Sequence, residues 1–407
     1  MKSHLGMLAD NLDQLPSEAH ASKRSQLSRW NSLWSPLDSR IVLVGITDEQ
    51  GDIITDPLKM LQAQAGFWSQ TFALKTVDLL LAERFIIRYG TKFFFPDSEI
   101  LLPPTCTNYH LTLARAPSAM AGPDGTPYSC WKAAGHEGAV TLHGMGKSLA
   151  DGDSTPSSFN DSLFFAPAKG SEPGDSKQVI RTPKTARPLM AKNTDNKTIC
   201  SVYNFCITGQ LTRYAHKAQS GFIKLRQGLW NRIAIDSVAR MLDIKYHNIS
   251  TPLLLLYDFF TAFPALAHGY IRLILKHSGL PKGFCNLVLA MYDDCQVYGT
   301  ADGIMIWLFG VYAGVLQGCP LSGSLFALSV DPLLRYIDAT LSPPELVRAF
   351  ADDIATALAS LQSLFTIHGI FVEFSKVSAL QLNDVKCVII PLSSSSAEVK
   401  RKHSAFS

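Results

Sequence analysis

The stretch AFADDIATAL, residues 349–358, places two adjacent carboxylates inside an otherwise apolar run. Apolar residues on both sides of a short polar pair are typical of a strand, a tight turn and a second strand. A buried unpaired charge is costly and two neighbouring like charges cost more, so a cation is expected beside Asp352 and Asp353. The stretch therefore indicates either a metal site or an ordinary tight turn.

Another apolar run ends in a carboxylate. PLLLLYDFF (252–260) is short and bounded, as a buried strand is, and Asp258 stands near its end. Aspartates at the ends of neighbouring strands can share divalent cations, and Mg²⁺ prefers one or two carboxylates together with substrate phosphates. Two such ions would activate a 3′-hydroxyl and stabilise a leaving pyrophosphate. The alternative is that Asp258 only caps a helix.

Small residues lie between the two acidic sites. Gln317 and Gly318 precede a predicted helix over 321–339 that begins with Ser322, Gly323 and Ser324. Small side chains at such a point let a nucleic-acid strand or base pair approach the backbone closely. An ordinary loop-to-helix cap is the alternative.

Composition favours a folded, non-secreted protein. The 407 residues are 47% hydrophobic and 17% charged, which permits a large core. The eight cysteines show no CxxC pair and no zinc spacing, and the first 20 residues lack the apolar segment of a secretory signal. The apolar run 304–316 is too short to span a bilayer comfortably, so we expect core strands there. We expect a nuclear or cytoplasmic location.

Positive charge is concentrated in residues 169–245, which carry 14 Lys and Arg against 5 Asp and Glu, a balance of +9. Such a stretch is a candidate phosphate-binding surface, although a solvated protein face is an equally good explanation of the charge alone.

Helical spacing of apolar residues predicts a helix over 59–90 that ends at Gly90, and residues 116–185 are rich in the Gly, Pro and Ser of loops. The segment GMGKS (144–148) does not qualify as a phosphate-binding P-loop, because Thr141 stands where its first glycine is required.

Eight segments, taken in order, resemble the motifs of the reverse transcriptase domain of non-LTR (LINE-type) retrotransposons. The resemblance covers roughly residues 115–392. Any one motif is weak, but eight in the right order are specific. The segments are AGPDGTPYSCWKA (121–133), FFAPAKG (164–170), TARPLMAKNTDNK (185–197), KAQSGFIKLRQ (217–227), LLYDFFTAF (255–263), GVLQGCPLSGSLF (314–326), FADD (350–353) and ALQLNDVKCVII (379–390).

The resemblance implies roles for the acidic residues. Asp258 and Asp352 would bind two Mg²⁺ ions, for which Mn²⁺ is a possible substitute. Asp353 would support the cluster, and Phe259 would lend its backbone carbonyl to one ion. The other acidic pair, Asp293-Asp294, precedes the glutamine-glycine motif, where the family has no catalytic acid, so we interpret it as a turn.

The resemblance also implies a nucleotide site. Lys169 and Arg187 would hold the triphosphate, with Arg suited to bidentate contact and Lys acting as a point charge. Phe263 matches the steric gate, whose ring crowds a 2′-hydroxyl and favours deoxynucleotides. Gln317 and Gly318 would contact the template and the nascent pair. Lys386 would lie near the pyrophosphate as a proton donor, unless it is only a surface lysine.

The fold class implied is α+β, with the palm and fingers of a right-hand polymerase: an antiparallel sheet backed by helices. We expect a mainly helical region of unknown role over 1–105, fingers over 106–245, a palm over 246–392 and a basic tail over 393–407. Too few residues follow the last motif to form the family's thumb, so it is expected to be missing. One departure is Ser322-Gly323, where the family usually has Ser-Pro.

The resulting hypothesis is an RNA-directed DNA polymerase with RNA template, DNA primer and deoxynucleoside triphosphates as partners, and without membrane contact. Two alternatives remain: a catalytically inactive, truncated remnant of a mobile element, and a non-enzymatic RNA-binding protein that reuses the fingers.

Overall fold

The computed structural model describes residues 42–48, 50–90, 102–170, 175, 178–246 and 248–392, so the predicted basic tail over 393–407 lies outside the described residues. The chain divides into two compact units. The first comprises Met1–Met60 and Ala166–Arg187, and the second comprises Leu61–Phe165 and Pro188–Ser407. The described residues form a mixed α+β structure with three sheets.

The first unit contains a three-stranded sheet of order β2-β1-β4. β1 (Val42–Thr47) pairs antiparallel with β2 (Ile53–Ile54) and parallel with β4 (Gln178–Arg181). The 3₁₀ turn η5 (Pro183–Thr185) follows β4.

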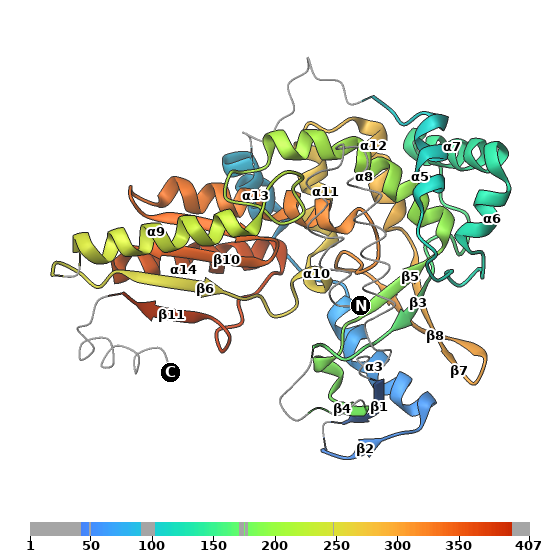
Figure 1. Ribbon diagram of the computed structural model, residues 1–407, viewed down its shortest axis with the longest axis horizontal. Helices are drawn as coiled ribbons and strands as arrows, with labels where there is room; N and C mark the ends of the chain where they lie inside the picture. Colours follow the sequence, from blue (N-terminus) through green and yellow to red (C-terminus); the bar gives the residue numbers. More distant parts are fainter. Residues whose placement is uncertain are drawn as a thin grey trace, which may run out of the picture. The chain divides into compact units, whose positions relative to one another are not determined.

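A four-stranded antiparallel sheet, here called the C-terminal sheet, lies in the second unit with order β11-β6-β10-β9. Both of its faces are covered by helices. α9 packs Ala239 and Leu242 against Ala357 on one face (Figure 1). On the other face, Tyr257 lies 4.6 Å from Phe371 of α14, centroid to centroid. The elements are β6 (Leu253–Tyr257), β9 (Leu346–Phe350), β10 (Asp353–Leu358), β11 (Val388–Pro391), α9 (Gly228–Tyr246) and α14 (Leu361–Ser378).

The second sheet of this unit has order β5-β3-β7-β8. β3 (Ser162–Phe165) pairs antiparallel with β5 (Leu189–Lys192) and parallel with β7 (Cys295–Ala301), which forms a hairpin with β8 (Ile304–Val311). The prediction of core strands over 304–316 is wrong for the first half of β8. Ile304, Met305 and Trp307 are exposed, because these residues belong to the outer end of an edge hairpin.

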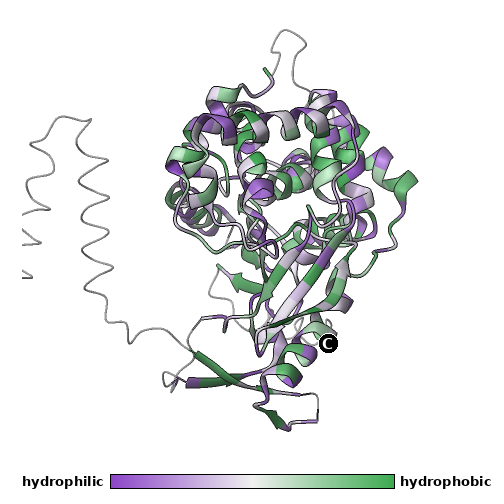
Figure 2. Cartoon of the chain, turned by 90° about the vertical axis from the view of Figure 1, so that its right-hand side faces the viewer, coloured by the Kyte–Doolittle hydropathy of each residue, from purple (hydrophilic) through white to green (hydrophobic). Residues whose placement is uncertain are grey.

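The remaining helices carry hydrophobic and hydrophilic residues side by side, as the hydropathy colouring of Figure 2 shows. α13 is buried along most of its length, including its internal Pro332. Among the described residues, no helix combines the length and apolarity needed to cross a membrane. The helices are α3 (Pro57–Phe72), α4 (Leu79–Phe85), η3 (Ile86–Gly90), α5 (Cys106–Arg115), α6 (Tyr128–Ala133), α7 (Gly135–Asp151), α8 (Thr194–Tyr214), α10 (Ala262–Ala265), α11 (His268–His277), α12 (Lys282–Met291) and α13 (Ser322–Thr340).

Two of the predicted segments differ in detail. The helix predicted over 59–90 is interrupted at residues 73–78, where Asp78 caps α4 by accepting a hydrogen bond from the Leu81 N–H at 2.9 Å. The helical residues η3 run to Gly90, the last described residue of this segment, so the predicted end stays a prediction. GMGKS lies inside α7, so the exclusion of a P-loop is confirmed, since that motif requires a loop between a strand and a helix.

Gly146 provides a test of the packing around α7. An added Cβ there would overlap the fully buried Tyr109 hydroxyl, whereas an added Cβ at Gly144 on the same helix meets nothing within 4 Å. We expect Gly146→Ala to lower the free energy of unfolding by about 1–3 kcal/mol through overpacking. Gly144→Ala should leave it unchanged or raise it by up to about 1 kcal/mol through helix propensity. Urea denaturation of both variants measures the difference, and equal stabilities would contradict this packing.

Candidate active site

The three predicted acidic residues lie at the same end of the C-terminal sheet. Tyr257 of β6 pairs with Ile354 of β10 in antiparallel register. Asp258 follows Tyr257 and Asp353 precedes Ile354, so the two aspartates are opposite each other, where Cβ atoms are typically about 4.5–5.5 Å apart. Asp352 stands beside them in the turn between β9 and β10.

The turn that carries Asp352 is tight and strained. Phe350 pairs with Asp353, which leaves Ala351 and Asp352 as a two-residue hairpin loop. Ala351 has φ 58°, in the left-handed region that favours glycine. A positive φ at the first loop position only is the pattern of a type II′ turn. Such strain persists only where the surroundings hold it in place.

Gln219 supplies that support. Its side chain is 1% exposed and hydrogen-bonds both backbone groups of Ala351. Oε1 accepts from the Ala351 N–H at 2.8 Å and from the Gly221 N–H at 2.8 Å, while Nε2 donates to the Ala351 carbonyl at 3.2 Å. A Cβ at Gly221 would overlap the Ala351 backbone, so the backbones at Gly221 and Ala351 pack against each other with no room for a side chain at Gly221.

Residues 216–228, here called the clamp loop, are fixed by further hydrogen bonds. The Arg226 guanidinium donates to the backbone carbonyls of Thr212, Ala215, His216 and Gln219. Within the basic stretch, Arg226 therefore serves the fold rather than a ligand. Arg181, Lys192 and Lys197 are also buried. These charges therefore do not contribute to the predicted phosphate-binding surface.

A cation lies beside the carboxylates. Lys386 Nζ is 3.6 Å from Asp258 Oδ2, and both side chains are partly exposed. The loop that carries Lys386 is tied to Asp258 by the Asn383 N–H, which donates to the Asp258 carbonyl at 2.8 Å. The predicted contact of Lys386 with pyrophosphate stays a prediction, but the structure places its ammonium group at the acidic cluster.

The carboxylates fit a metal ion that takes part of its ligands from substrate phosphates. In the part of the chain that the structure describes, no three His, Cys, Asp or Glu side chains converge closely enough to form a complete metal cage. Mg²⁺ is usually held by one or two carboxylates plus substrate phosphates, so a complete cage is not required. Two backbone hydrogen bonds flank Phe259: the Asn383 N–H donates to the Asp258 carbonyl, and the Phe260 N–H donates to the Gln381 carbonyl. Neither of these two bonds uses the Phe259 carbonyl, which is the predicted metal ligand. The predicted metal roles remain predictions.

The predicted gate residue and the glutamine-glycine segment lie close together. The Val315 N–H donates to the Phe263 carbonyl at 2.8 Å, and the Phe263 ring stacks on Phe326 at 4.4 Å. The Gln317 carbonyl accepts a hydrogen bond from the Met190 N–H at 2.9 Å. Gly318 has φ 122° and a Cβ there would overlap the Met190 carbonyl, so only glycine fits.

The two predicted triphosphate ligands belong to the first unit. Lys169 and Arg187 are both exposed and lie on a short antiparallel ladder around the pair Ala168 and Ala186. The Lys169 N–H donates to the Thr185 carbonyl at 2.8 Å, and the Arg187 N–H donates to the Pro167 carbonyl at 2.9 Å. The structure thus brings these two cations together with each other, and their role with a triphosphate remains a prediction.

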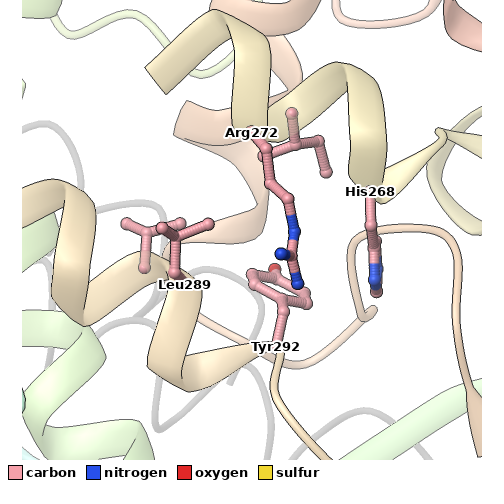
Figure 3. Close-up of a pocket in the computed structure, with 6 residues that line it drawn as sticks. His268, Arg272, Leu289 and Tyr292 are labelled. Carbon is pink, nitrogen blue, oxygen red and sulfur yellow. The ribbon is translucent and has the colours of Figure 1, made fainter. Parts of the chain in front are cut away.

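Two of the cavities in the second unit bear on the candidate site. A cavity of about 490 Å³ lies between α9 and the C-terminal sheet, and Asp353 and Phe350 line it. A second cavity, of about 10 Å³, has room for roughly one water molecule and is lined by His268, Arg272 and Tyr292 (Figure 3). The His268 ring lies 2.8 Å from the Gly314 carbonyl, and burial lowers the pKa of His268. The smaller cavity is therefore packing beneath residues 314–318 and not a substrate site.

The other aspartate pair is a turn, as predicted. Asp293 and Asp294 connect α12 to β7, and Asp294 has φ 41°. The Asp293 carbonyl accepts a hydrogen bond from Asn160 Nδ2 at 2.6 Å.

Residues 174–400 match the family "Reverse transcriptase (RNA-dependent DNA polymerase)". Because the match covers more than half of the chain, the chain belongs to the reverse transcriptase family.

The relatives found are proteins of mobile elements. The chain is 31% identical over 138 residues to the retrovirus-related Pol polyprotein from type-2 retrotransposable element R2DM of Drosophila melanogaster, which is 33% of this chain and 13% of the relative. It is 25% identical over 196 residues to the transposon TX1 uncharacterized 149 kDa protein of Xenopus laevis, 46% of this chain and 14% of the relative. It is 26% identical over 196 residues to the retrovirus-related Pol polyprotein from type-1 retrotransposable element R2 of Popillia japonica, which is 43% of this chain and 27% of the relative.

These matches relate the domain to non-LTR retrotransposon proteins. The chain spans only between 13% and 27% of the length of these relatives.

Removing the Gln219 side chain tests the clamp. Gln219→Ala leaves the buried N–H and carbonyl of Ala351 without their partner, and each unsatisfied group costs about 1–3 kcal/mol. We expect the free energy of unfolding to fall by about 2–4 kcal/mol, measured by urea denaturation. Gln362→Ala, on an exposed position of α14, is the matched control and should change it by less than about 0.5 kcal/mol. Equal effects of the two changes would rule out the clamp.

His216, at the base of the clamp loop, should make the stability of the protein depend on pH. Burial lowers the pKa of His216 from 6.5 to about 4, although Asp338 Oδ2 lies 3.3 Å from its Nε2 and opposes the shift. Below pH 6.5 the unfolded chain therefore binds the extra proton more readily. The contribution of neutral His216 to the free energy of unfolding is therefore complete above pH 6.5, and it is lost as the pH falls towards 4. Denaturation across this window should show a steeper loss of stability for the wild type than for His216→Gln, and parallel curves would contradict the assignment.

Proposed function

We propose that the chain is the palm and fingers of an RNA-directed DNA polymerase, which copies RNA into DNA by attack of a primer 3′-hydroxyl on the α-phosphate of a deoxynucleotide. The observation that supports the proposal is the position of Asp258, Asp352 and Asp353 at one end of the paired strands β6 and β10. We assign residues 246–392 to the palm and 106–245 to the fingers. The family match supports this assignment.

The carboxylates would act by holding charge in fixed positions. Asp258 and Asp352 would bind two Mg²⁺ ions, with Asp353 and the Phe259 carbonyl in support. When bound, the ions supply an activated primer hydroxyl and charge neutralisation on the leaving pyrophosphate. Lys386, near Asp258, would offer a proton or a positive charge to the pyrophosphate. Catalysis of this kind depends on positioning, which the supported hairpin turn favours.

The other predicted residues would hold the nucleotide and the template. Lys169 and Arg187 would bind the triphosphate as exposed cations. Phe263 would exclude the ribose 2′-hydroxyl, while Gln317 and Gly318 would contact the template and the nascent pair. The cavity beside Asp353 offers space for the end of the primer. Because phosphate contacts dominate, template binding should weaken steeply with salt.

The setting of the activity is part of the proposal. RNA template, DNA primer and deoxynucleoside triphosphates are the proposed partners, and Mn²⁺ is a proposed substitute for Mg²⁺. A nuclear location suits an element that primes on chromosomal DNA, and a cytoplasmic location is the alternative.

Primer extension on a homopolymer RNA template with Mg²⁺ tests the proposal. We expect Asp352→Asn to lower the rate of extension by at least about 10²-fold, because it removes an anionic metal ligand worth several kcal/mol. Asp293→Asn, in the turn that is not part of the cluster, is the control and should retain the wild-type rate.

The outcomes separate the alternatives. RNA binding without extension by the wild-type chain would favour a binding protein, and a chain that neither binds nor extends would favour an inactive remnant. Equal extension by Asp352→Asn and the wild type would remove the carboxylates from the mechanism.

A further inference from the structure

The predicted gate ring of Phe263 contacts two other aromatic rings. One side of Phe263 stacks on Phe326 of α13, with centroids 4.4 Å apart and an interplanar angle of 13°. Phe222 of the clamp loop meets Phe263 in an edge contact, with centroids 5.7 Å apart and an angle of 74°. Phe326 is fully buried, whereas Phe222 is 53% exposed. The Phe263 ring is therefore supported from the core and also from the surface.

The backbone of Phe222 is in an unusual conformation. Its φ is 60°, in the left-handed region that residues with a Cβ rarely adopt. The loop around it is fixed by Gln219 on one side and by Arg226 on the other. A large apolar side chain gains little by standing half in solvent in a strained conformation. Such strain is typical of residues at functional sites, which indicates a role for Phe222 beyond core packing.

The Phe222 ring occupies a space that Gly323 leaves open. A Cβ at Gly323, the second residue of α13, would overlap Phe222 Cδ1 and approach its Cγ to 2.7 Å. Gly323 is the position at which the family resemblance predicts proline, and a proline Cβ would collide in the same way. Phe222 and Gly323 thus form a matched pair in this chain.

We propose that Phe222 is a positioning residue for sugar selection, which holds the Phe263 ring in the orientation that excludes a ribose 2′-hydroxyl. This inference rests on the proposed polymerase function. Phe222 acts through Phe263: Phe326 stacks on the gate ring, and the edge contact of Phe222 limits the rotation of that ring. Loss of the edge contact leaves Phe263 in place but lets its ring turn away from the sugar.

The test compares a deoxynucleotide with the matching ribonucleotide. In primer extension, the ratio of the two kcat/KM values should fall roughly three- to tenfold in Phe222→Leu, the range that corresponds to one aromatic ring contact. The value for the deoxynucleotide should stay within about twofold of the wild type. Phe222→Tyr, which keeps the ring, should restore the ratio. Phe205→Leu removes another exposed ring, from α8, and should leave the ratio unchanged.

A second variant approaches the contact from the other side. Gly323→Ala should displace the Phe222 ring and lower the same ratio, while thermal unfolding reports whether the variant is folded. Extension with an unchanged ratio in Phe222→Leu overturns the inference and leaves the polymerase function standing. A folded Phe222→Leu that loses deoxynucleotide incorporation also overturns it, because the role is then not selectivity. Failure of the wild type to incorporate deoxynucleotides overturns the proposed function itself.

Discussion

The antiparallel pairing of β6 with β10 in a single register is the constraint on which the site depends. It sets Tyr257 against Ile354 and so places Asp258 opposite Asp353. A slip of one residue would turn every side chain of the slipped strand to the opposite face, and helices α9 and α14 cover both faces of the sheet. Packing on two sides therefore fixes the register, and the register holds like charges together that would otherwise separate.

The loops around this sheet turn a strand end into an ordered site. The turn at Ala351 is strained, and Gln219 satisfies both of its backbone groups from a segment 132 residues away in sequence. The same clamp loop carries Phe222, which contacts the ring of Phe263. One short loop thus contacts both the acidic turn and the ring of Phe263, the predicted gate.

Local patterns in the sequence were sufficient for the elements that carry the acids. The strand–turn–strand at 349–358 and the helix beginning at Ser322 follow from periodicity and turn residues, which act over a few positions. Contacts between distant segments could not be predicted in this way. Nothing near Gln219 indicates that its amide meets Ala351, and counting charges does not reveal that Lys192 is buried. The helix α7 was also missed, because its glycines are typical of loops.

The central claim is that Asp258, Asp352 and Asp353 hold divalent metal together. The most direct measurement is anomalous diffraction from crystals of the chain with Mn²⁺, a primer–template duplex and a non-hydrolysable deoxynucleotide. The account predicts manganese peaks at contact distance, about 2.0–2.3 Å, from carboxylate oxygens of Asp258 and Asp352, bridged by phosphate oxygens. Nucleotide bound with manganese only at other positions, or with Asp258 turned away from the ion, would contradict it.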